Sequence, residues 1–494
     1  MNPLFGTETE YGVAVKGDGA PDPVSNAIFL VNSSPFVSLS TPLWDYENEN
    51  PLLDARGFEV EGDRERPGPE YNRMLNKPLV NGGRLYVDGA HPEYSTPECV
   101  DARALVAHEK AGERIMEAAL VAANRRKREM GVGFSVYKNN TDGKGNSYGY
   151  HENYLVSRTV PFDTLVAQMT PFFVTRPIFA GAGKVGAEHR SEACDYQLSQ
   201  RADFFEVLID LNTMVKRPLI NTRDEPHCDM GRWRRFHVIV GDANMSEVST
   251  YLKVGTTALV LAMIEQGREV KGVEIENPVR AIREVSRDLT LKKTLRLSRG
   301  AAWRAVDIQR AYLETAEAHF AQDVDPVTRD ILARWRQVLE ALSDDPMRLS
   351  RSLDWVIKKR LIESYMNRKG CAWSDSRVQM MGLQYHDIDR NKGLYYTLER
   401  GGHVDRIVAD ASVIAAQATP PADTRAYFRG TCLRKFAKEV YAASWTSVLF
   451  YASDGTIKRV PLMDPYKGNQ ERVGSLLDAS DTVDALLSRM TLPT

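Results

Sequence analysis

The stretch RLYVDGAHPEYSTPE, residues 84–98, brings together side chains that can bind metal ions and transfer protons. An alternating strand would place Arg84, Tyr86 and Asp88 on one face and the apolar residues between them on the other. After a His-Pro turn the chain supplies a further acid, Glu93. Carboxylates suit Mg²⁺, which commonly binds to one or two of them together with nucleotide phosphates. The stretch therefore indicates a metal or nucleotide site or, more simply, an ion pair between Arg84 and Asp88 on one strand.

A second pair of acids lies near the start of the chain, in GTETEYG, residues 6–12. Glu8 and Glu10 are two residues apart, so a strand directs both carboxylates to one face. Two like charges side by side are unfavourable unless a cation or an arginine neutralises them. The pair is typical either of a metal site or of a solvated edge strand.

Arginine and histidine side chains recur further along the chain. Arg201 in LSQRAD and Arg223 in INTRDEPH could clamp phosphate groups. Arg235 and His237 alternate onto one strand face in RRFHVIVGDAN, which makes His237 a candidate metal ligand. His151 follows the loop YKNNTDGKGNSYGY, whose glycines could let backbone N–H groups approach a phosphate. The simpler alternatives are surface arginines and a surface hairpin loop.

The segment FAGAGKVG, residues 179–186, looks superficially like a phosphate-binding P-loop. That motif requires glycine at position 178 and serine or threonine at 185, where this chain has Ile178 and Val185. The candidate residues therefore predict a nucleotide–Mg²⁺ site on the face of a sheet, without a P-loop. The metal ion of this site would be bound by Glu8, Glu10, Glu93 and His237, and Asp88 would face the same cavity.

Strand and helix patterns indicate how these residues are positioned. The expected elements are a strand over 4–15 closed by Gly17 and Gly19, a helix over 101–131 capped by Asp101 and ended by Gly131, a strand over 234–244, a helix over 245–267, mostly helices to about 370, and a helix plus hairpin from about 425. Strands and helices interleave without regular βαβ spacing, which favours an α+β fold with a largely antiparallel sheet. We expect a large domain over 1–424 and a small C-terminal domain over 425–494.

The segment between the first expected strand and the stretch 84–98, about residues 42–80, shows no sustained helix or strand periodicity. Residues 45–74 hold nine acids and four Arg/Lys, a local net charge of −5. We expect a long, acidic, mobile insertion, because connections of this length are usually functional or disordered. It could gate the nucleotide or the substrate path, or have no role.

Composition excludes several classes of protein. The 494 residues are 43% hydrophobic and 26% charged with a net charge of −2, so no global basic field indicates a nucleic-acid partner. No apolar run approaches the roughly 20 residues that span a bilayer, and no basic or apolar leader begins the chain. The five cysteines are scattered and never spaced CxxC, which suits a reducing compartment. We expect a cytoplasmic protein without nucleic-acid or membrane partners.

Six motifs of the chain resemble the signatures of the enzymes that act on Pup, the prokaryotic ubiquitin-like protein. They are GTETEYG, GRLYVDGAHPEYSTPE, YKNNTDGKGNSYGYHENY, LSQRAD, INTRDEPH and RRFHVIVGDAN. That family contains the Pup ligase and the Pup deamidase/depupylase, and it is related to glutamine synthetase and other carboxylate–amine ligases. Six long motifs match in order over effectively the whole chain. The resemblance implies a glutamine-synthetase-like, curved and mainly antiparallel sheet cradle backed by helices, with a small C-terminal domain.

Two features resemble the deamidase/depupylase branch more than the ligase branch. The segment WDYENENPLLDARGF looks like a loop characteristic of that branch, and the DGAHPEYS turn has the shorter spacing between Asp88 and His91. Gly89 departs from the pattern, because a larger residue such as histidine is expected there.

By motif matching, the resemblance implies roles for individual residues. Glu8, Tyr86 and Glu93 are expected around Mg²⁺, with Glu10 and His237 as further metal or phosphate ligands. The residues expected to bind nucleotide or to line its phosphates are Arg84, Thr96, Trp445, His151, Arg201 and Arg223. Trp445 in AASWTSV suits stacking on adenine.

The implied reaction is ATP- and Mg²⁺-dependent hydrolysis of the side-chain amide at the C-terminal residue of Pup, with Pup and pupylated proteins as partners. ATP is expected to be required but not consumed stoichiometrically. Asp88 is the expected catalytic residue, either as a nucleophile or as a base for water, and a nucleotide phosphate is a third possible nucleophile. The alternative activity is Pup ligation through a phosphorylated glutamate; a non-catalytic nucleotide-dependent Pup-binding protein is a third.

Overall fold

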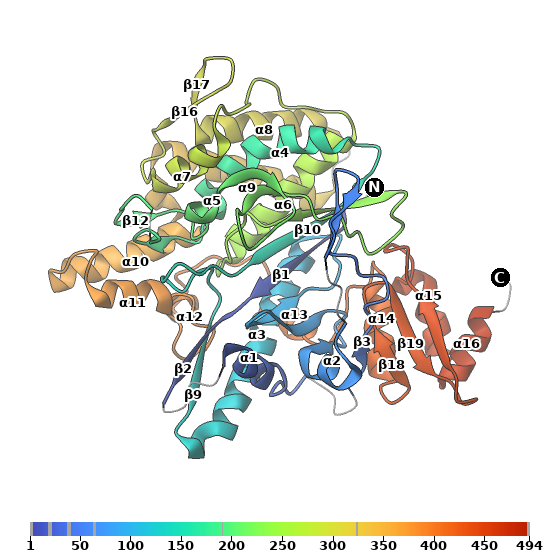
Figure 1. The fold of residues 1–494 in the computed structure, drawn as a ribbon. Coiled ribbons are helices and arrows are strands. Elements are labelled where there is room, and N and C mark those ends of the chain that lie inside the picture. Colours follow the sequence, from blue (N-terminus) through green and yellow to red (C-terminus); the bar gives the residue numbers. More distant parts are fainter. Residues whose placement is uncertain are drawn as a thin grey trace.

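A six-stranded sheet forms the centre of the protein (Figure 1). The structure, a computed structural model, describes residues 3–17, 22–36, 41–62, 66–189, 191–322 and 325–491. The strand order is β15 (Trp233–Val238), β10 (Tyr150–Ser157), β1 (Phe5–Glu10), β8 (His91–Ser95), β7 (Arg84–Asp88) and β6 (Asn76–Pro78). Every neighbouring pair in this sheet is antiparallel, which confirms the predicted sheet type.

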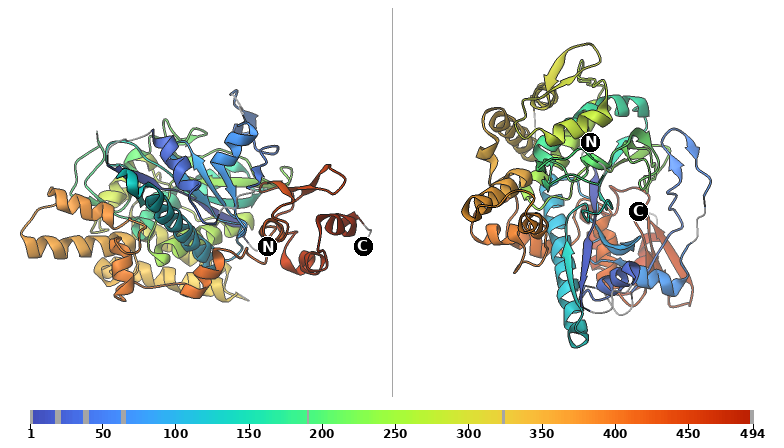
Figure 2. Two further views of the ribbon diagram at one scale, coloured as in Figure 1. Left: turned by 90° about the horizontal axis from the view of Figure 1, so that it is seen from below. Right: turned by 60° about the vertical axis from the view of Figure 1, so that its left-hand side comes forward.

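Helices cover one side of this sheet and confirm the α+β prediction (Figures 1 and 2). The main ones are α3 (Ala102–Lys127), α4 (Phe162–Thr175), α6 (Glu247–Glu265), α8 (Ala305–His319) and α9 (Pro326–Asp344). The others in this part of the chain are α1 (Pro23–Val31), α5 (Pro177–Ala180), α7 (Pro278–Arg287), α10 (Asp354–Lys369), α11 (Ser376–Gln384), α12 (Leu394–Arg400) and α13 (Asp410–Ala416). Apolar side chains of most of these helices and of the sheet share one large buried core, whereas those of α1, α12 and α13 pack in smaller separate clusters.

Apart from a strand pair in the acidic segment, described below, four short strand pairs lie outside the central sheet in the described part of the chain. They are β2 (Gly12–Lys16) with β9 (Gly133–Tyr137), β11 (Lys184–Val185) with β12 (Tyr196–Gln197), β13 (Val207–Asp210) with β14 (Pro218–Asn221), and β16 (Thr294–Arg296) with β17 (Ala302–Arg304). The β13–β14 pair is parallel and the other three are antiparallel.

The predicted first strand is split in two. β1 stays in the central sheet, whereas β2 leaves it after Tyr11 and pairs with β9. Gly12 stands at this break, and a Cβ there would lie 2.3 Å from the Tyr148 hydroxyl. The close approach of Tyr148 therefore favours glycine where the two strand pairs diverge.

The helices expected around residues 101–131 and 245–267 are present. Asp101 caps α3 by accepting a hydrogen bond from the Arg103 N–H at 2.6 Å, and Gly131, with φ of 67°, ends the following 3₁₀ turn. Among the described residues, α6 is the one helix long and apolar enough to cross a membrane. Its apolar window is 94% buried inside the fold, as in the core helix of a globular protein.

The acidic segment differs from the irregular insertion that we expected. Its described parts contain β3 (Leu43–Trp44), β4 (Leu53–Asp54), β5 (Phe58–Glu59) and α2 (Pro69–Leu75), while residues 63–65 lie outside the described residues. Thr222 holds the segment in place: its carbonyl accepts the Ala55 N–H at 2.7 Å, and its hydroxyl donates to Asp54 at 2.6 Å. Each of these strands has only two residues, and β3 pairs with the distant β18, so the local sequence shows no strand periodicity.

The C-terminal part contains the predicted helix and hairpin. Its elements are α14 (Ala426–Lys435), β18 (Val440–Ala443), β19 (Ser447–Tyr451), β20 (Ile457–Pro461), α15 (Gln470–Asp478) and α16 (Val483–Thr491). Its sheet has the order β20-β19-β18-β3, so a strand of the acidic segment forms one edge (Figure 1). A separate apolar cluster lies beneath it. The domain boundary between residues 424 and 425 stays a prediction.

Glu98 links the core to the C-terminal part. Its carboxylate forms ion pairs with Arg425, at 2.7 Å, and with Arg429. Burial alone would raise the pKa of Glu98, but the charges and hydrogen bonds of Arg429 and Arg425 outweigh it and lower the pKa to about 2. Removing one partner of such a buried pair leaves the other charges uncompensated.

We predict that Glu98→Gln lowers the free energy of unfolding by about 3 kcal/mol at neutral pH, because two buried guanidinium groups lose their counterion. A carboxylate with a lowered folded-state pKa stabilises the fold above its ordinary pKa of about 4.3. That contribution disappears as the pH falls toward 2, the folded-state pKa of Glu98. Urea unfolding at several pH values should therefore show a gap between wild type and variant that narrows in acid.

Asp344→Asn is the control, because both side chains of the Asp344–Arg348 ion pair are exposed. An exposed pair contributes at most about 1 kcal/mol, so this variant should unfold almost like wild type. Equal unfolding of Glu98→Gln and wild type at pH 7 would contradict the assignment.

Candidate functional site

A cavity of about 430 Å³ lies against the central sheet and collects most of the candidate residues. Its lining includes Glu8, Glu10, Arg84, Tyr86, Asp88, His151, Arg201, Arg223 and Trp445. The antiparallel register explains why they meet. Glu8 lies opposite His151, and Glu10 lies opposite Glu93, which in turn lies opposite Tyr86. Alternation along each strand then points every second side chain to the same face.

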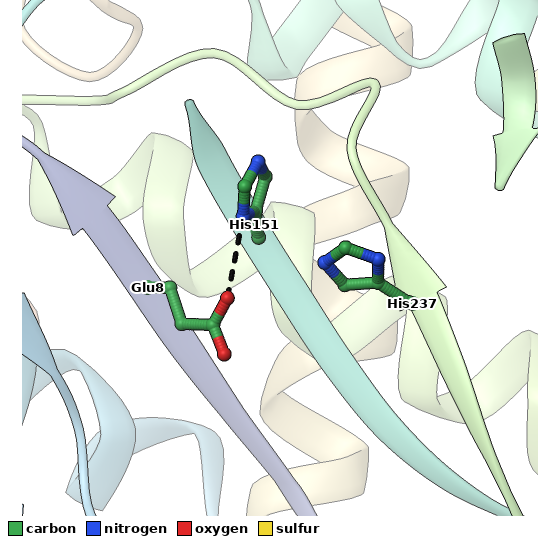
Figure 3. Close-up of side chains that lie close together, drawn as sticks. All are labelled: Glu8, His151 and His237. Carbon is green, nitrogen blue, oxygen red and sulfur yellow. Dashed lines mark hydrogen bonds and ion pairs between the residues drawn. The ribbon is translucent and has the colours of Figure 1, made fainter. Parts of the chain in front are cut away.

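Glu8, His151 and His237 form the first cluster, with potential ligand atoms within 4.8 Å of one another (Figure 3). His151 Nδ1 lies 3.2 Å from a Glu8 oxygen, and Asn153 donates to the other oxygen at 3.1 Å. Burial alone would raise the pKa of Glu8, but the His151 hydrogen bond and the nearby positive charge of Arg235 lower it to about 2. Glu8 is therefore a carboxylate at neutral pH.

His237 presents an imidazole suited to binding a metal. Its Nδ1 donates to the Asn221 amide oxygen at 2.9 Å, so the lone pair is assigned to Nε2. That buried Nε2 has no hydrogen-bond partner among the described residues. Burial and the charge of Arg235 lower the pKa of His237 well below its usual value, which keeps the ring neutral.

Glu10, Asp88 and Glu93 form the second cluster, also with ligand atoms within 4.8 Å of one another. Burial and the charges of Asp88 and Glu10 raise the pKa of Glu93 well above its usual value. One buried oxygen of Glu93 has no hydrogen-bond partner among the described residues. A cation would relieve both the repulsion and the unsatisfied oxygen.

Gly149 lies where the two clusters meet. A Cβ at this position would lie 2.4 Å from His151 Nε2 and 2.6 Å from a Glu10 oxygen. Only a residue without a side chain lets these two groups pack so close to the backbone.

The donor sets fit divalent cations. Three carboxylates offer the oxygen ligands that Mg²⁺ prefers, while a carboxylate with two imidazoles is also open to transition metals. The predicted metal residues thus divide between the clusters, Glu8 and His237 in one and Glu10 and Glu93 in the other. Tyr86 lies beside Glu93, and its hydroxyl accepts a hydrogen bond from Ser95 at 3.3 Å. Burial and the charge of Glu93 raise the pKa of Tyr86, so it stays protonated.

The cavity arginines fall into two pairs. Arg223 and Arg235 lie on the Glu8 side, where their charges help to lower the pKa of that acid, after burial and the His151 hydrogen bond. Arg201 and Arg217 lie beside the 147–149 segment, donating to the carbonyls of Tyr148 and Ser147 at 3.2 and 3.0 Å. Each of the two clusters therefore has its own pair of arginines nearby.

Aromatic rings surround the remaining predicted nucleotide residues. The Arg84 guanidinium lies 4.0 Å from the ring centres of both Trp44 and Tyr86. Trp445 packs edge to face with Trp44 at 5.2 Å. A smaller, mainly apolar cavity of about 90 Å³ adjoins the first and is lined by Thr96 and Trp445 among others. It could accept a flat aromatic ring, and the nucleotide roles stay predictions.

The structure adds residues that the sequence analysis missed. Asn153 bonds Glu8, and its position two residues after His151 on β10 was a usable signal. His91 lies 3.5 Å from Glu10, and Glu49 of the acidic segment lies 4.0 Å from Arg84. Arg217 follows no periodic pattern that could have marked it. Gly89, the departure noted above, has φ of 54° and no neighbour within 4 Å of a Cβ, so the turn itself suits glycine.

The chain is similar to several known proteins over most of its length. The depupylase of Acidothermus cellulolyticus is 49% identical over 507 residues, covering 99% of both chains. The Pup deamidase/depupylase of Mycolicibacterium smegmatis is 42% identical over 499 residues, covering 99% of this chain and all of that protein. The solved structure of the Pup ligase PafA in complex with ADP has a TM-score of 0.75 and 34% identity, covering 85% of this chain and 97% of that chain.

The family model described as Pup-ligase protein matches residues 3–449. That range includes the central sheet, both clusters of acids and Trp445. The chain therefore belongs to the Pup-ligase protein family.

Proposed function

We propose that this protein is an amidohydrolase of the depupylase branch. It would remove the side-chain amide of Pup's C-terminal glutamine and cut the isopeptide bond between Pup and substrate lysines. Asp88 carries the proposal, because it stands with Glu10 and Glu93 in the cavity that also holds the arginines. Full-length likeness to a depupylase and to a Pup deamidase/depupylase supports hydrolysis over ligation.

The chemistry adds water across an amide. The carbon–nitrogen bond breaks, the glutamyl side chain becomes a carboxylate, and ammonia or the lysine amine takes up a proton. Asp88 either attacks the carbonyl carbon or removes a proton from water. The guanidinium groups near the clusters would stabilise the oxyanion that develops on the carbonyl oxygen. A bound Mg²⁺, held by Glu10 and Glu93 with Glu8 and His237 nearby, would polarise that oxygen further.

ATP is the nucleotide that we assign to the cavity, required for activity but not consumed with each turnover. Thr96, Trp445 and the smaller cavity suit its base, and Arg84, Arg223 and His151 suit its phosphates. The relative solved with ADP supports nucleotide binding in this family. The partners are Pup and pupylated proteins, without nucleic acid or membrane, and we place the protein in the cytoplasm.

One assay separates the candidate activities. The protein is mixed with ATP and Mg²⁺ and given either a Pup conjugate or Pup ending in glutamate plus a target protein. We expect release of Pup from the conjugate without matching formation of ADP. Conjugation coupled to ADP formation would instead identify a ligase, and binding of Pup without either reaction would indicate a non-catalytic protein.

We predict that Asp88→Asn lowers kcat about 100-fold or more, because the amide can neither attack the carbonyl nor accept a proton. Binding of ATP should persist, since Asp88 adjoins the acids and not the aromatic pocket. Steady-state cleavage and calorimetric titration with ATP measure the two effects. The exposed Asp163 provides the control variant Asp163→Asn, which should be fully active. Near-normal turnover by Asp88→Asn would rule out both roles for this residue.

We predict that Gly149→Ala lowers turnover about 10- to 100-fold, because the new methyl group would collide with both His151 and Glu10 and displace them. The concentration of Mg²⁺ giving half-maximal activity should rise, while the melting temperature changes little. Gly68→Ala is the matched control, since its Cβ would meet nothing within 4 Å. Unchanged Mg²⁺ dependence in Gly149→Ala would show that the two clusters tolerate separation.

A further inference from the structure

Arg201 and Arg217 lie side by side although they come from different loops. They donate to the carbonyls of consecutive residues, Arg201 Nη1 to Tyr148 at 3.2 Å and Arg217 Nη2 to Ser147 at 3.0 Å. The Arg217 Nε also donates to the Thr213 carbonyl at 2.8 Å, which fixes the plane of its guanidinium. Both side chains line the large cavity.

In the described part of the chain the pair forms no ion pair, although the charge of Glu10 acts on both guanidinium groups from farther away. Among the described residues, no carboxylate oxygen lies within 4.0 Å of either guanidinium, whereas Arg235 has Glu225 at 3.7 Å. Arg201 is only 2% exposed, and its buried Nε has no hydrogen-bond partner in the described part of the chain. Burial and the adjacent charge of Arg217 lower the pKa of Arg201 to about 10. A buried and a half-buried guanidinium side by side without a paired anion are unfavourable, so a bound anion would complete the site.

The position of the pair indicates which anion it receives. The carbonyls that hold Arg201 and Arg217 belong to residues 147 and 148, and the next residue, Gly149, packs against Glu10. Glu10 shares a cluster with Asp88, whereas Arg223 and Arg235 influence Glu8 in the other cluster. The Arg201–Arg217 pair therefore adjoins the acids around the reacting carbonyl.

We propose that Arg201 and Arg217 bind the free α-carboxylate of the C-terminal residue whose side-chain amide is hydrolysed. This rests on the proposed function. In such a residue the α-carboxylate is separated from the reacting carbonyl only by the α-carbon and two methylene groups, so a neighbouring cation pair can hold it. Arginine binds carboxylates through two parallel hydrogen bonds, which fixes orientation as well as charge. The pair would thus select a chain terminus over an internal glutamine.

The test compares two Pup substrates that differ only at the α-carboxylate. Each carries a fluorescent amine on the side-chain carbonyl of its last residue, and one ends in a free carboxylate while the other ends in a carboxamide. Release of the fluorescent amine reports side-chain cleavage alone, and fluorescence anisotropy reports binding in the presence of ATP and Mg²⁺. We expect the wild-type protein to bind and cleave the free acid about 10- to 100-fold better than the carboxamide. This is the effect of losing charge-assisted hydrogen bonds between arginine and a carboxylate.

Arg217→Met should remove this preference. Its affinity and kcat/KM for the free acid should fall to the level of the carboxamide, mainly through KM, while the carboxamide is unaffected. Arg217→Lys should restore part of the preference, which excludes simple misfolding, and the exposed Arg299→Met should behave like wild type. The affinity for ATP should stay unchanged in all variants.

Three outcomes would overturn the proposal. Equal binding of the two substrates by wild type would show that the α-carboxylate is not recognised. An equal loss of affinity and kcat/KM for both substrates in Arg217→Met, with weaker ATP binding, would show that Arg217 binds a nucleotide phosphate instead. A preference that survives Arg217→Met would place the carboxylate elsewhere. A separate outcome distinguishes this proposal from the proposed function. Wild type could cleave neither substrate but bind the free acid better, with that preference lost in Arg217→Met. Such a result would support the carboxylate site and contradict the hydrolytic function.

Discussion

Repulsion between carboxylates on adjacent strands is the constraint around which the structure is organised. Glu10 on β1, Asp88 on β7 and Glu93 on β8 lie within reach of one shared ion, and Glu8 on β1 belongs to the neighbouring cluster with His151 and His237. Close like charges are strongly unfavourable in a partly buried cavity. The strand register forces the acids together, and the surrounding arginines, with His151 hydrogen-bonded to Glu8, make the arrangement tolerable. A site of this kind is preorganised to bind cations and anionic ligands.

The opposite face of the same strands shows how that arrangement is held rigid. The hydroxyls of Thr7 and Tyr150 both donate to Glu109 of α3, at 3.2 and 2.7 Å, and Glu109 pairs with the buried Lys138 at 2.6 Å. Thr7 and Tyr150 are the chain neighbours of Glu8 and His151. A buried ionic group of this kind contributes geometry more than stability, so α3 fixes the spacing of β1 and β10 beneath the first cluster.

The sequence predicted those parts of the site that follow a local period. Alternation placed Arg84, Tyr86 and Asp88 on one face, and the antiparallel α+β fold followed from the element order. Which strands pair is set by contacts far apart in the chain, so the division of the acids between two clusters was not predictable. The acidic segment was misjudged for the same reason, and Arg217, on an irregular loop, left no local signal.

The edge strand β3 has a consequence for how the protein is made. It leaves the ribosome early, but its partner strand β18 and Trp445, which packs edge to face with Trp44, are among the last segments synthesised. Pairing between segments so distant in sequence forms late. The aromatic pocket is therefore finished only when the chain is nearly complete, and a nascent or truncated polypeptide carries both clusters of acids without the aromatic wall beside them.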